Sequence, residues 1–397
     1  MDEFVRPSVA AYAEQAKRYE QAGDGQAALR SYLIATHLQM LLLNPGDAGA
    51  CFQLGMAFGQ AGEDRHAAAA FRAAVSLQPA HAESWNNLGV LTDAAAALRH
   101  AVRLSPGRAD YHTNLAHTLL SEGCFAEGFR EWEWRTPSPP RSFTQPRWDG
   151  SPFPGKTLLI HAEQGYGDSL QFCRFLPLAA RLGGRVVVET RAPLAGPLGR
   201  LGGVASIVRW GDPLPDFDLH LPLPSLANLF HAAPVSPPYL TAPPERATSW
   251  HDRLAGSSGK RKVGLVWACN PKAPDQRRSV PFPQIADMVR DLPDIAFFSL
   301  QREGERTCEG LVPLGEQIGD FDDLAGALMS LDLLISVDTA AAHMAGGLGR
   351  DLWVLLPHAA DWRWREEWYP AARRYRQLQP GDWKDVLDRV GADLRRL

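Results

Sequence analysis

Several features that mark common classes of protein are scarce in this sequence of 397 residues. It has five cysteines, and none of them forms a CxxC pair. That spacing argues against a disulfide framework and against a zinc site, and it indicates a reducing, cytoplasmic environment. The cysteines are Cys51, Cys124, Cys173, Cys269 and Cys308.

Excess charge and long apolar runs are scarce as well. The formal net charge is −4 and the isoelectric point is about 6.3, so bulk attraction to nucleic acid or to an anionic membrane is not expected. No run reaches the roughly 18 apolar residues of a membrane-spanning helix. The opening residues also lack the apolar core of a signal peptide. We therefore expect no membrane span and no nucleic-acid partner.

A chain of this length suggests two or three domains, and the first part is repetitive. Pro45, Pro79 and Pro106 each follow an amphipathic run and precede a new helix start, at spacings of 34 and 27 residues. Because proline cannot continue a helix, it marks the step to the next repeat. Residues 51–79 fit a helix, a turn and a second helix, and they resemble the tetratricopeptide pattern. Residues 8–135 are thus predicted to form a TPR domain.

The third repeat is seven residues shorter than the second, as the two spacings show (34 against 27). It passes from "LGVL" directly to "TDAAAALRH" without the usual turn between helices. We expect a shortened first helix or a distorted unit there.

The remainder of the chain has a different pattern. Residues 136–152 are rich in proline without a period, and they predict a semi-rigid linker. Short β-rich runs then alternate with helical stretches, which is typical of parallel sheets with both faces covered. A break at "GSSGK" separates two such lobes, predicted at 153–255 and 260–397. The predicted fold class is therefore a helical repeat domain followed by two Rossmann-like α/β lobes.

The first lobe has one stretch with candidate chemistry, "LLIHAEQGYGDSLQF". A strand ends near His161, a turn with two glycines follows, and a helix begins near Asp168. The carboxylate of Asp168 is either a helix N-cap or a general base at the floor of a cleft, and the sequence alone leaves both open. The spacing is not GxGxxG, so a dinucleotide site is not indicated.

The second lobe places polar residues after two predicted strands. The loop after "GLVWA" carries Asn270, Lys272 and Arg278, and such a loop either holds a diphosphate or is merely solvated. The strand "FFSLQ" ends with Ser299 and Gln301. Ligands bind at the carboxyl ends of parallel strands, so both groups are candidates for donor binding.

The stretch "SVDTAAAHMAGGLG" combines an acid, a hydroxyl and an imidazole at one strand end. Small residues, among them Ala341, keep the following helix slim, so its N-terminal N–H groups can approach a phosphate. Asp338 is expected to bind a sugar hydroxyl or to position Lys272 or Arg278. Thr339 and His343 complete the candidate pocket, although His343 alone could also be a core histidine.

These stretches, in this order, resemble bacterial TPR-repeat proteins with a C-terminal GT-B domain similar to the ADP-heptose:lipopolysaccharide heptosyltransferases. The same plan resembles protein O-glycosyltransferases. The resemblance implies a metal-independent glycosyltransferase without a cofactor that acts on a nucleotide-diphosphate-sugar. The hypothesis that follows is transfer of the sugar to a protein, peptide or glycan acceptor bound through the TPR groove. The resemblance also implies Asp168 as the base of an acceptor lobe. The donor lobe would contribute Asn270, Lys272, Arg278, Ser299, Gln301, Asp338, Thr339, Ala341 and His343.

Two other interpretations remain open. In the first, the protein is a scaffold whose GT-B-like domain is inactive. In the second, it is an enzyme of another class with two α/β lobes, such as a sugar-nucleotide epimerase. The loop "DWRWREEWYP" either caps a ligand or packs the lobes together, and packing is favoured for its tryptophans. The sugar, the nucleotide and the acceptor are not indicated by the residues.

Overall fold

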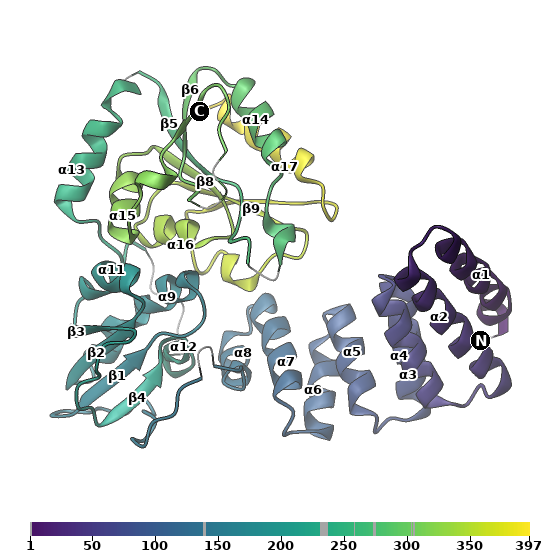
Figure 1. The fold of residues 1–397 in the computed structure, drawn as a ribbon. Helices are drawn as coiled ribbons and strands as arrows, with labels where there is room; N and C mark the ends of the chain where they lie inside the picture. Colours follow the sequence, from purple (N-terminus) through teal and green to yellow (C-terminus); the bar gives the residue numbers. More distant parts are fainter. Residues whose placement is uncertain are drawn as a thin grey trace. The chain divides into compact units, whose positions relative to one another are not determined.

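The computed structural model describes residues 2–137, 140–230, 237–257, 259–272, 275–302, 304 and 306–397. The chain divides into two compact units, Met1–Thr136 and Pro137–Leu397. Among the described residues of the first unit, all regular structure is helical (Figure 1). Its helices are α1 (Asp2–Gln21), α2 (Gly25–Leu43), α3 (Ala48–Gln60), α4 (Asp64–Leu77), α5 (Ala82–Thr92), α6 (Ala95–Leu104), α7 (Ala109–Glu122) and α8 (Phe125–Trp132).

Consecutive helices of this unit pack in pairs, α1 with α2, α3 with α4, α5 with α6 and α7 with α8. The helices α2, α4 and α6 end shortly before Pro45, Pro79 and Pro106, as the sequence predicts. Glycine permits close approach of paired helices: a Cβ atom at Gly55 would come within 2.6 Å of the ring of Phe71. The prediction of helical repeats is confirmed. The repeat boundaries have a local cause, because a proline that follows the second helix of a pair prevents that helix from continuing.

The third helix pair is α5 with α6, and both members are short. Helix α5 has 11 residues and α6 has 10, against 13 and 14 in the pair α3 and α4. Asp93 connects the two helices with a left-handed backbone (φ 50°). The expected shortening of the first helix is confirmed. The second helix of the pair is also shortened, and by more residues than the first.

The first sheet of the second unit has four parallel strands in the order β3-β2-β1-β4. Residues Pro146 to Trp148, which lie in the predicted linker, run beside β4 through a bridge from Arg147 to His220. The strands are β1 (Thr157–His161), β2 (Arg185–Thr190), β3 (Val204–Arg209) and β4 (Leu219–Pro222), and the α-helices of this lobe are α9 (Tyr166–Phe172), α10 (Leu176–Ala180), α11 (Ala195–Gly199) and α12 (Leu226–Phe230).

The second sheet has six parallel strands in the order β10-β9-β8-β5-β6-β7. This is the 3-2-1-4-5-6 order of a Rossmann fold, whose order reverses between β5 and β8. Each central strand is a run of buried apolar residues, which is typical of a sheet covered on both faces. The strands are β5 (Arg261–Val266), β6 (Ile295–Ser299), β7 (Leu311–Pro313), β8 (Leu333–Val337), β9 (Leu352–Leu356) and β10 (Arg373–Arg376).

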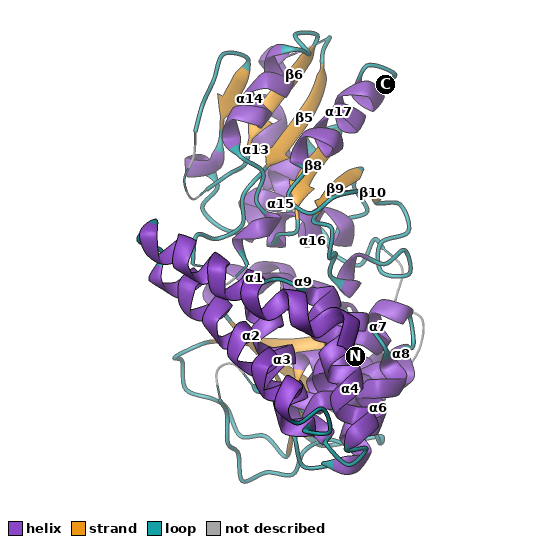
Figure 2. Ribbon diagram, turned by 90° about the vertical axis from the view of Figure 1, so that its right-hand side faces the viewer, coloured by secondary structure: helices purple, strands orange, loops and turns teal. Residues whose placement is uncertain are grey.

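Helices cover the six-stranded sheet on both faces (Figures 1 and 2). Helices α14 and α17 pack against each other and share the apolar core of one face with β5, β6, β8, β9 and β10. Helix α13 packs on α15, and its Trp250 is buried beside Gly326. The helices are α13 (Pro244–Arg253), α14 (Phe282–Arg290), α15 (Phe321–Met329), α16 (Ala340–Gly347) and α17 (Trp383–Leu394).

The predicted fold class is confirmed: helical repeats precede two parallel α/β lobes in the arrangement known as GT-B. No helix among the described residues is long and apolar enough to cross a membrane.

Candidate functional site

The two lobes meet through the helices that follow β1 and β8. Helix α9 begins five residues after β1 ends, and α16 begins three residues after β8 ends. The two helices pack against each other. Gly167 of α9 lies so close to His343 of α16 that a Cβ atom there would approach the His343 Cδ2 atom to 2.8 Å. Strand ends of both lobes therefore contribute to one site.

Asp168 is the third residue of α9, and both of its carboxylate oxygens have partners. Oδ2 accepts a hydrogen bond of 3.0 Å from the N–H of Gly165, the residue that caps the helix. Oδ1 accepts from Arg363 of the other lobe, 3.0 Å from Nε and 2.8 Å from a terminal nitrogen. The capping interpretation of Asp168 is correct in part, because the residue closes the helix start from the N3 position. The carboxylate also connects the two lobes.

Arg363 lies in the loop after β9, within the short 3-10 helix Trp362–Trp364. Its guanidinium also pairs with Asp361 at 3.0 Å, so two carboxylates share one cation. Burial by itself lowers the pKa of Arg363, but Asp361 and Asp168 outweigh it and raise the pKa overall. Trp362 and Trp364 are each 2% exposed, which confirms the expected packing role of these tryptophans.

His343 is buried, with 3% of its surface exposed. Its ring stacks on Trp364 at 4.6 Å between ring centres, and its Nδ1 lies 2.9 Å from the hydroxyl of Tyr369. Burial lowers the pKa of His343 to about 3, the largest of several influences. The imidazole is thus neutral near pH 7 and acts as a hydrogen-bonding group rather than a cation. Its Nε2 faces Asp338, 3.8 Å from Oδ1.

Asp338 follows β8 directly and is 8% exposed. Its Oδ2 accepts a hydrogen bond of 2.8 Å from Arg278, which stands in the loop after β5. Burial lowers the pKa of Arg278 by itself, whereas the Asp338 charge raises it and the net shift is upward. Arg278 follows β5 and Asp338 follows β8, and these are the neighbouring strands between which the order of the sheet reverses. Asp338 therefore meets Arg278 in the crevice where open α/β sheets bind ligands.

The start of α16 is shaped by Thr339 and Ser336. Thr339 is the N-cap, and its hydroxyl lies 2.9 Å from the hydroxyl of Ser336 rather than on a helix N–H group. Ala341 is partly exposed in the first turn, where its side chain adds little bulk. The first N–H groups of a helix lack partners within it, and they carry partial positive charge.

Two of the predicted donor-binding residues face inward. Ser299 is fully buried and its hydroxyl accepts from the N–H of Gln301 at 3.3 Å. The Gln301 amide bonds both the N–H (3.1 Å) and the carbonyl (3.2 Å) of Ala268. These contacts tie the end of β6 to the loop after β5, so both residues support that loop.

The loop after β5 places two other predicted residues in solvent. Asn270 and Lys272 are both exposed, and the Asn270 side chain accepts from the N–H of Lys272 at 2.8 Å. That contact forms a local turn. Within the described ranges, neither side chain forms a hydrogen bond or an ion pair with Asp338 or Arg278. The structure therefore unites Asp168, His343, Asp338 and Arg278 but not these two.

A buried arginine that the sequence analysis did not single out joins the lobes beneath the site. Arg174, fully buried after α9, donates to the hydroxyl of Tyr239 (2.9 Å) and to the carbonyl of Trp368 (3.0 Å). Its guanidinium also lies over the ring of Tyr369 at 4.9 Å. The one available signal was an arginine within the otherwise apolar run "LQFCRFLPL". Arg363 was missed as a partner of Asp168 because it lies 195 residues away.

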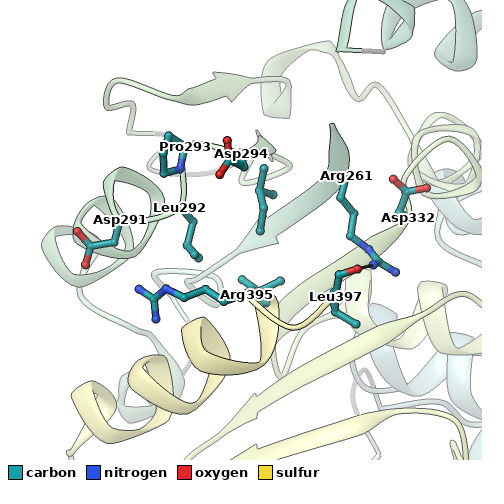
Figure 3. A pocket seen from close by; sticks show the side chains of 10 residues that line it. Arg261, Asp291, Leu292, Pro293, Asp294, Asp332, Arg395 and Leu397 are labelled. Atoms are coloured by element: carbon teal, nitrogen blue, oxygen red, sulfur yellow. Dashed lines mark hydrogen bonds between the residues drawn. The ribbon is translucent and has the colours of Figure 1, made fainter. Parts of the chain in front are cut away.

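A separate pocket of about 610 Å³ lies at the opposite end of the six-stranded sheet (Figure 3). It is lined near the starts of β5, β6 and β8, where Arg261 donates to the carbonyl of Leu397 at 3.1 Å. Ligand sites in open α/β sheets lie at the carboxyl ends, so this pocket is not the candidate site. Among the residues that the structure describes, no group of three or more His, Cys, Asp or Glu side chains is arranged to hold a metal ion.

The chemistry available at the lobe junction combines a carboxylate with a cation. Asp168 supplies an oxygen acceptor on the side of the first lobe. The second lobe supplies the Arg278 guanidinium, the neutral His343 ring and the start of α16. Such a set suits transfer of a group from an anionic leaving group to a hydroxyl.

Comparison with known proteins gives the following similarities. No protein-family model matches the chain. Protein FlbA of Caulobacter vibrioides is 28% identical over 327 residues, which covers 70% of this chain and 54% of FlbA. The chain thus spans about half the length of this relative.

Two solved structures are similar to parts of the chain or to most of it. The ADP-heptose lipopolysaccharide heptosyltransferase II of E. coli is 14% identical, with a TM-score of 0.47, over 60% of this chain and 98% of that one. An O-GlcNAc transferase of Thermobaculum terrenum is 17% identical, with a TM-score of 0.30, over 99% of this chain and 93% of that one.

Proposed function

We propose that this protein is a glycosyltransferase that moves a sugar from a nucleotide-diphosphate-sugar to a protein or glycan acceptor recruited by the helical repeats. The observation that carries the proposal is that Gly167, the neighbour of Asp168 in the first lobe, contacts His343 of the second lobe, which in turn faces the Asp338–Arg278 pair. A proton acceptor and a cation from different lobes thus stand at one junction. Transfer of a group from an anionic leaving group to a hydroxyl needs both.

In the proposed reaction the first lobe binds the acceptor and the second lobe binds the donor. Asp168 accepts the proton of the acceptor hydroxyl while the oxygen of that hydroxyl forms a bond to the anomeric carbon of the sugar. The bond from that carbon to the diphosphate oxygen breaks, and the nucleoside diphosphate leaves with the electron pair. Oδ1 of Asp168 already accepts from two nitrogens of Arg363, whereas Oδ2 accepts only from the N–H of Gly165 and keeps a lone pair with which a substrate hydroxyl can bond.

The leaving diphosphate would be stabilised by fixed positive charge. Arg278 offers bidentate contacts, and the N–H groups at the start of α16 add partial charge. Asn270 and Lys272 belong to the same loop and would fold over the diphosphate, while Ser299 and Gln301 hold that loop in place. Asp338 would bind a sugar or ribose hydroxyl beside Arg278, with Thr339 and Ala341 lining the start of the helix. The neutral His343 ring would serve as a hydrogen-bond donor without adding charge.

A thermal-shift titration with ADP, GDP, UDP and CMP tests the donor site. A ligand that binds only the native state raises stability as RT ln(1 + [L]/Kd). We expect one nucleotide to raise the melting temperature of the wild type, and Arg278→Ala and Asp338→Ala to lose the effect. Arg277→Ala is the matched control, because Arg277 is the exposed neighbour and pairs with Asp275 instead. Failure of every nucleotide at millimolar concentration would refute the donor site.

A catalytically inactive scaffold is the second candidate, and one observation favours it. Asp168 is already held by Arg363 and Gly165, as a purely structural carboxylate would be. Release of free nucleotide from nucleotide-sugars, measured with the wild type and with Asp168→Asn, separates the two functions. Turnover that falls in the variant while nucleotide binding persists supports the enzyme. Binding without turnover in the wild type supports the scaffold.

A further inference from the structure

An aromatic cluster with one cation stands at the carboxyl edge of the first sheet. Arg191 follows β2 directly and Trp210 follows β3 directly, and the N–H of Trp210 donates to the carbonyl of Thr190 at 2.9 Å. The Arg191 guanidinium lies over the Trp210 ring at 4.2 Å and over the Tyr166 ring at 5.2 Å. Tyr166 is the first residue of α9, so the cluster adjoins the helix that carries Asp168.

Arg191 differs from the other arginines near the lobe junction in its partners. One terminal nitrogen donates to the carbonyl of Gln164 at 2.6 Å, and in the part of the chain that the structure describes no carboxylate lies within ion-pair distance of it. Arg191 is partly exposed. By contrast, Arg363 and Arg278 each pair with an aspartate at the lobe junction.

The surroundings of the Arg191 guanidinium favour binding of an anion. Burial lowers the pKa of Arg191, and the charges of Tyr166 and Asp168 act in the opposite direction without bringing it an ion pair. Tyr166 is 37% exposed, and its ring lies 5.2 Å from that of Phe321 at the start of α15. A group entering here would thus meet ring faces from both lobes, close to Asp168.

We propose that Arg191, between Tyr166 and Trp210, is an acceptor subsite that binds the carboxylate of an acidic residue next to the modified hydroxyl of a peptide. This inference rests on the proposed function, because it assigns the acceptor to the first lobe. A guanidinium binds a carboxylate through two parallel hydrogen bonds, and ring faces on either side hold its plane fixed. A peptide is favoured over a free acidic sugar because helical repeats present extended surfaces for protein chains.

The test follows the tryptophan signals of the full chain labelled with 5-fluorotryptophan, and Trp210→Phe assigns the Trp210 signal. Acetyl-Glu-Ser-Glu-amide and acetyl-Gln-Ser-Gln-amide are titrated into the wild type. We expect the Glu peptide to shift the Trp210 signal with an affinity about tenfold higher than the Gln peptide, since the lost contact is a charge-assisted pair. Equal affinity of the two peptides, or no shift with either, would overturn the proposal.

Variants locate the contact on one side chain. Arg191→Gln is expected to remove the preference for the Glu peptide, and Arg191→Lys is expected to keep part of it, because lysine retains the charge but not the planar fork. Arg209→Gln is the matched control, since Arg209 is exposed and is the last residue of β3, directly before Trp210. Retention of the preference in Arg191→Gln would overturn the assignment. If Arg191→Gln fails to fold, the peptide pair on the wild type still decides the question.

Two further arms separate the alternatives. Glucuronate that shifts the Trp210 signal while the Glu peptide does not would show that the carboxylate belongs to a sugar, and the peptide assignment would be wrong. Nucleotide binding by the same wild-type sample separates the two proposals. Bound nucleotide without a peptide response refutes the acceptor subsite alone, whereas absence of both refutes the proposed function as well.

Discussion

Asp168 at the start of α9 and Arg363 in the loop after β9 form an ion pair of 2.8 Å that connects the two α/β lobes. Both side chains are mostly buried, with exposed fractions of 17% and 15%. Arg363 is held in turn by Asp361, and the Asp168 carboxylate is also fixed by the N–H of Gly165. The orientation of Asp168 therefore depends on the second lobe.

Removal of Arg363 is expected to destabilise the second unit strongly. Arg363→Ala leaves two carboxylates without their shared cation, and breaking a buried ion pair costs about 3–5 kcal/mol. Urea unfolding followed by tryptophan fluorescence measures the loss. Arg290→Ala is the control, because its pair with Asp287 is exposed and is worth less than about 1 kcal/mol. Equal losses in the two variants would contradict the structural role of Arg363.

Stability is expected to fall with pH below about 6.5 because of His343. Its folded pKa of about 3 lies below the ordinary value of 6.5, so the unfolded chain binds a proton there that the folded chain does not. The contribution is complete above the unfolded pKa and decreases as the pH falls toward the folded one, by up to about 1.4 kcal/mol per pH unit. Urea unfolding at pH 7, 6 and 5 compares the wild type with His343→Gln.

The difference in pH dependence between the wild type and His343→Gln separates the effect of the histidine on stability from that of the carboxylates, which titrate in both proteins. His343→Gln should show a flatter dependence between pH 7 and 5 than the wild type. His251→Gln changes an exposed residue and serves as the control, with the wild-type dependence retained. A wild-type slope that survives in His343→Gln would show that other groups cause it.

Substitution of Gly167 tests the close contact between α9 and α16. The new methyl group of Gly167→Ala would come 2.8 Å from His343 Cδ2, so the lobes or the ring must shift. Overpacking of this kind costs about 1–3 kcal/mol. Gly202→Ala is the control in the same lobe, because no atom lies within 4 Å of its added Cβ, and we expect a change of less than about 0.5 kcal/mol. Similar values for the two, from thermal or urea unfolding, would show that the helices are not in contact in solution.

The pair of Arg278 and Asp338 is expected to be energetically coupled. Single variants Arg278→Ala and Asp338→Ala and the double variant form a cycle, and contacting residues of this kind couple by about 0.5–3 kcal/mol. Unfolding free energies measure the coupling without any ligand. A matched cycle on Arg277 and Asp275, an exposed pair, should give a smaller value. Additive effects in the Arg278 cycle would mean that the hydrogen bond of 2.8 Å does not persist in solution.

Local signals in the sequence determine much of the architecture. Pro45, Pro79 and Pro106 end helices wherever they stand, because proline lacks the N–H group and clashes with the preceding turn. Buried strands such as "LLISV" and "LWVLL" are recognisable because a doubly covered sheet needs continuous apolar runs. Helical repeats and two α/β lobes could thus be predicted.

The candidate site was predictable in its members but not in its connections. Asp338 and Arg278 were noticed separately as polar residues after strands, yet their pairing depends on β5 and β8 being neighbours in the sheet. Ser299 and Gln301 looked similar in sequence, but their side chains turn inward because Gln301 satisfies the backbone of Ala268. Beyond the end of a strand, the alternation of side chains between the two faces of the sheet no longer predicts which way a side chain points.

The sequence by itself determined where the helices end, which runs are buried strands and which polar residues follow them, because these depend on neighbouring residues. Only the tertiary structure decided that Arg363 holds Asp168 across the lobes, that Arg174 lies buried among aromatic rings, and that Arg191 has no carboxylate partner in the described chain. These relationships join residues far apart in the chain. Their physical cause is the packing of elements that are distant in the sequence, such as α9 against α16, which no local pattern contains.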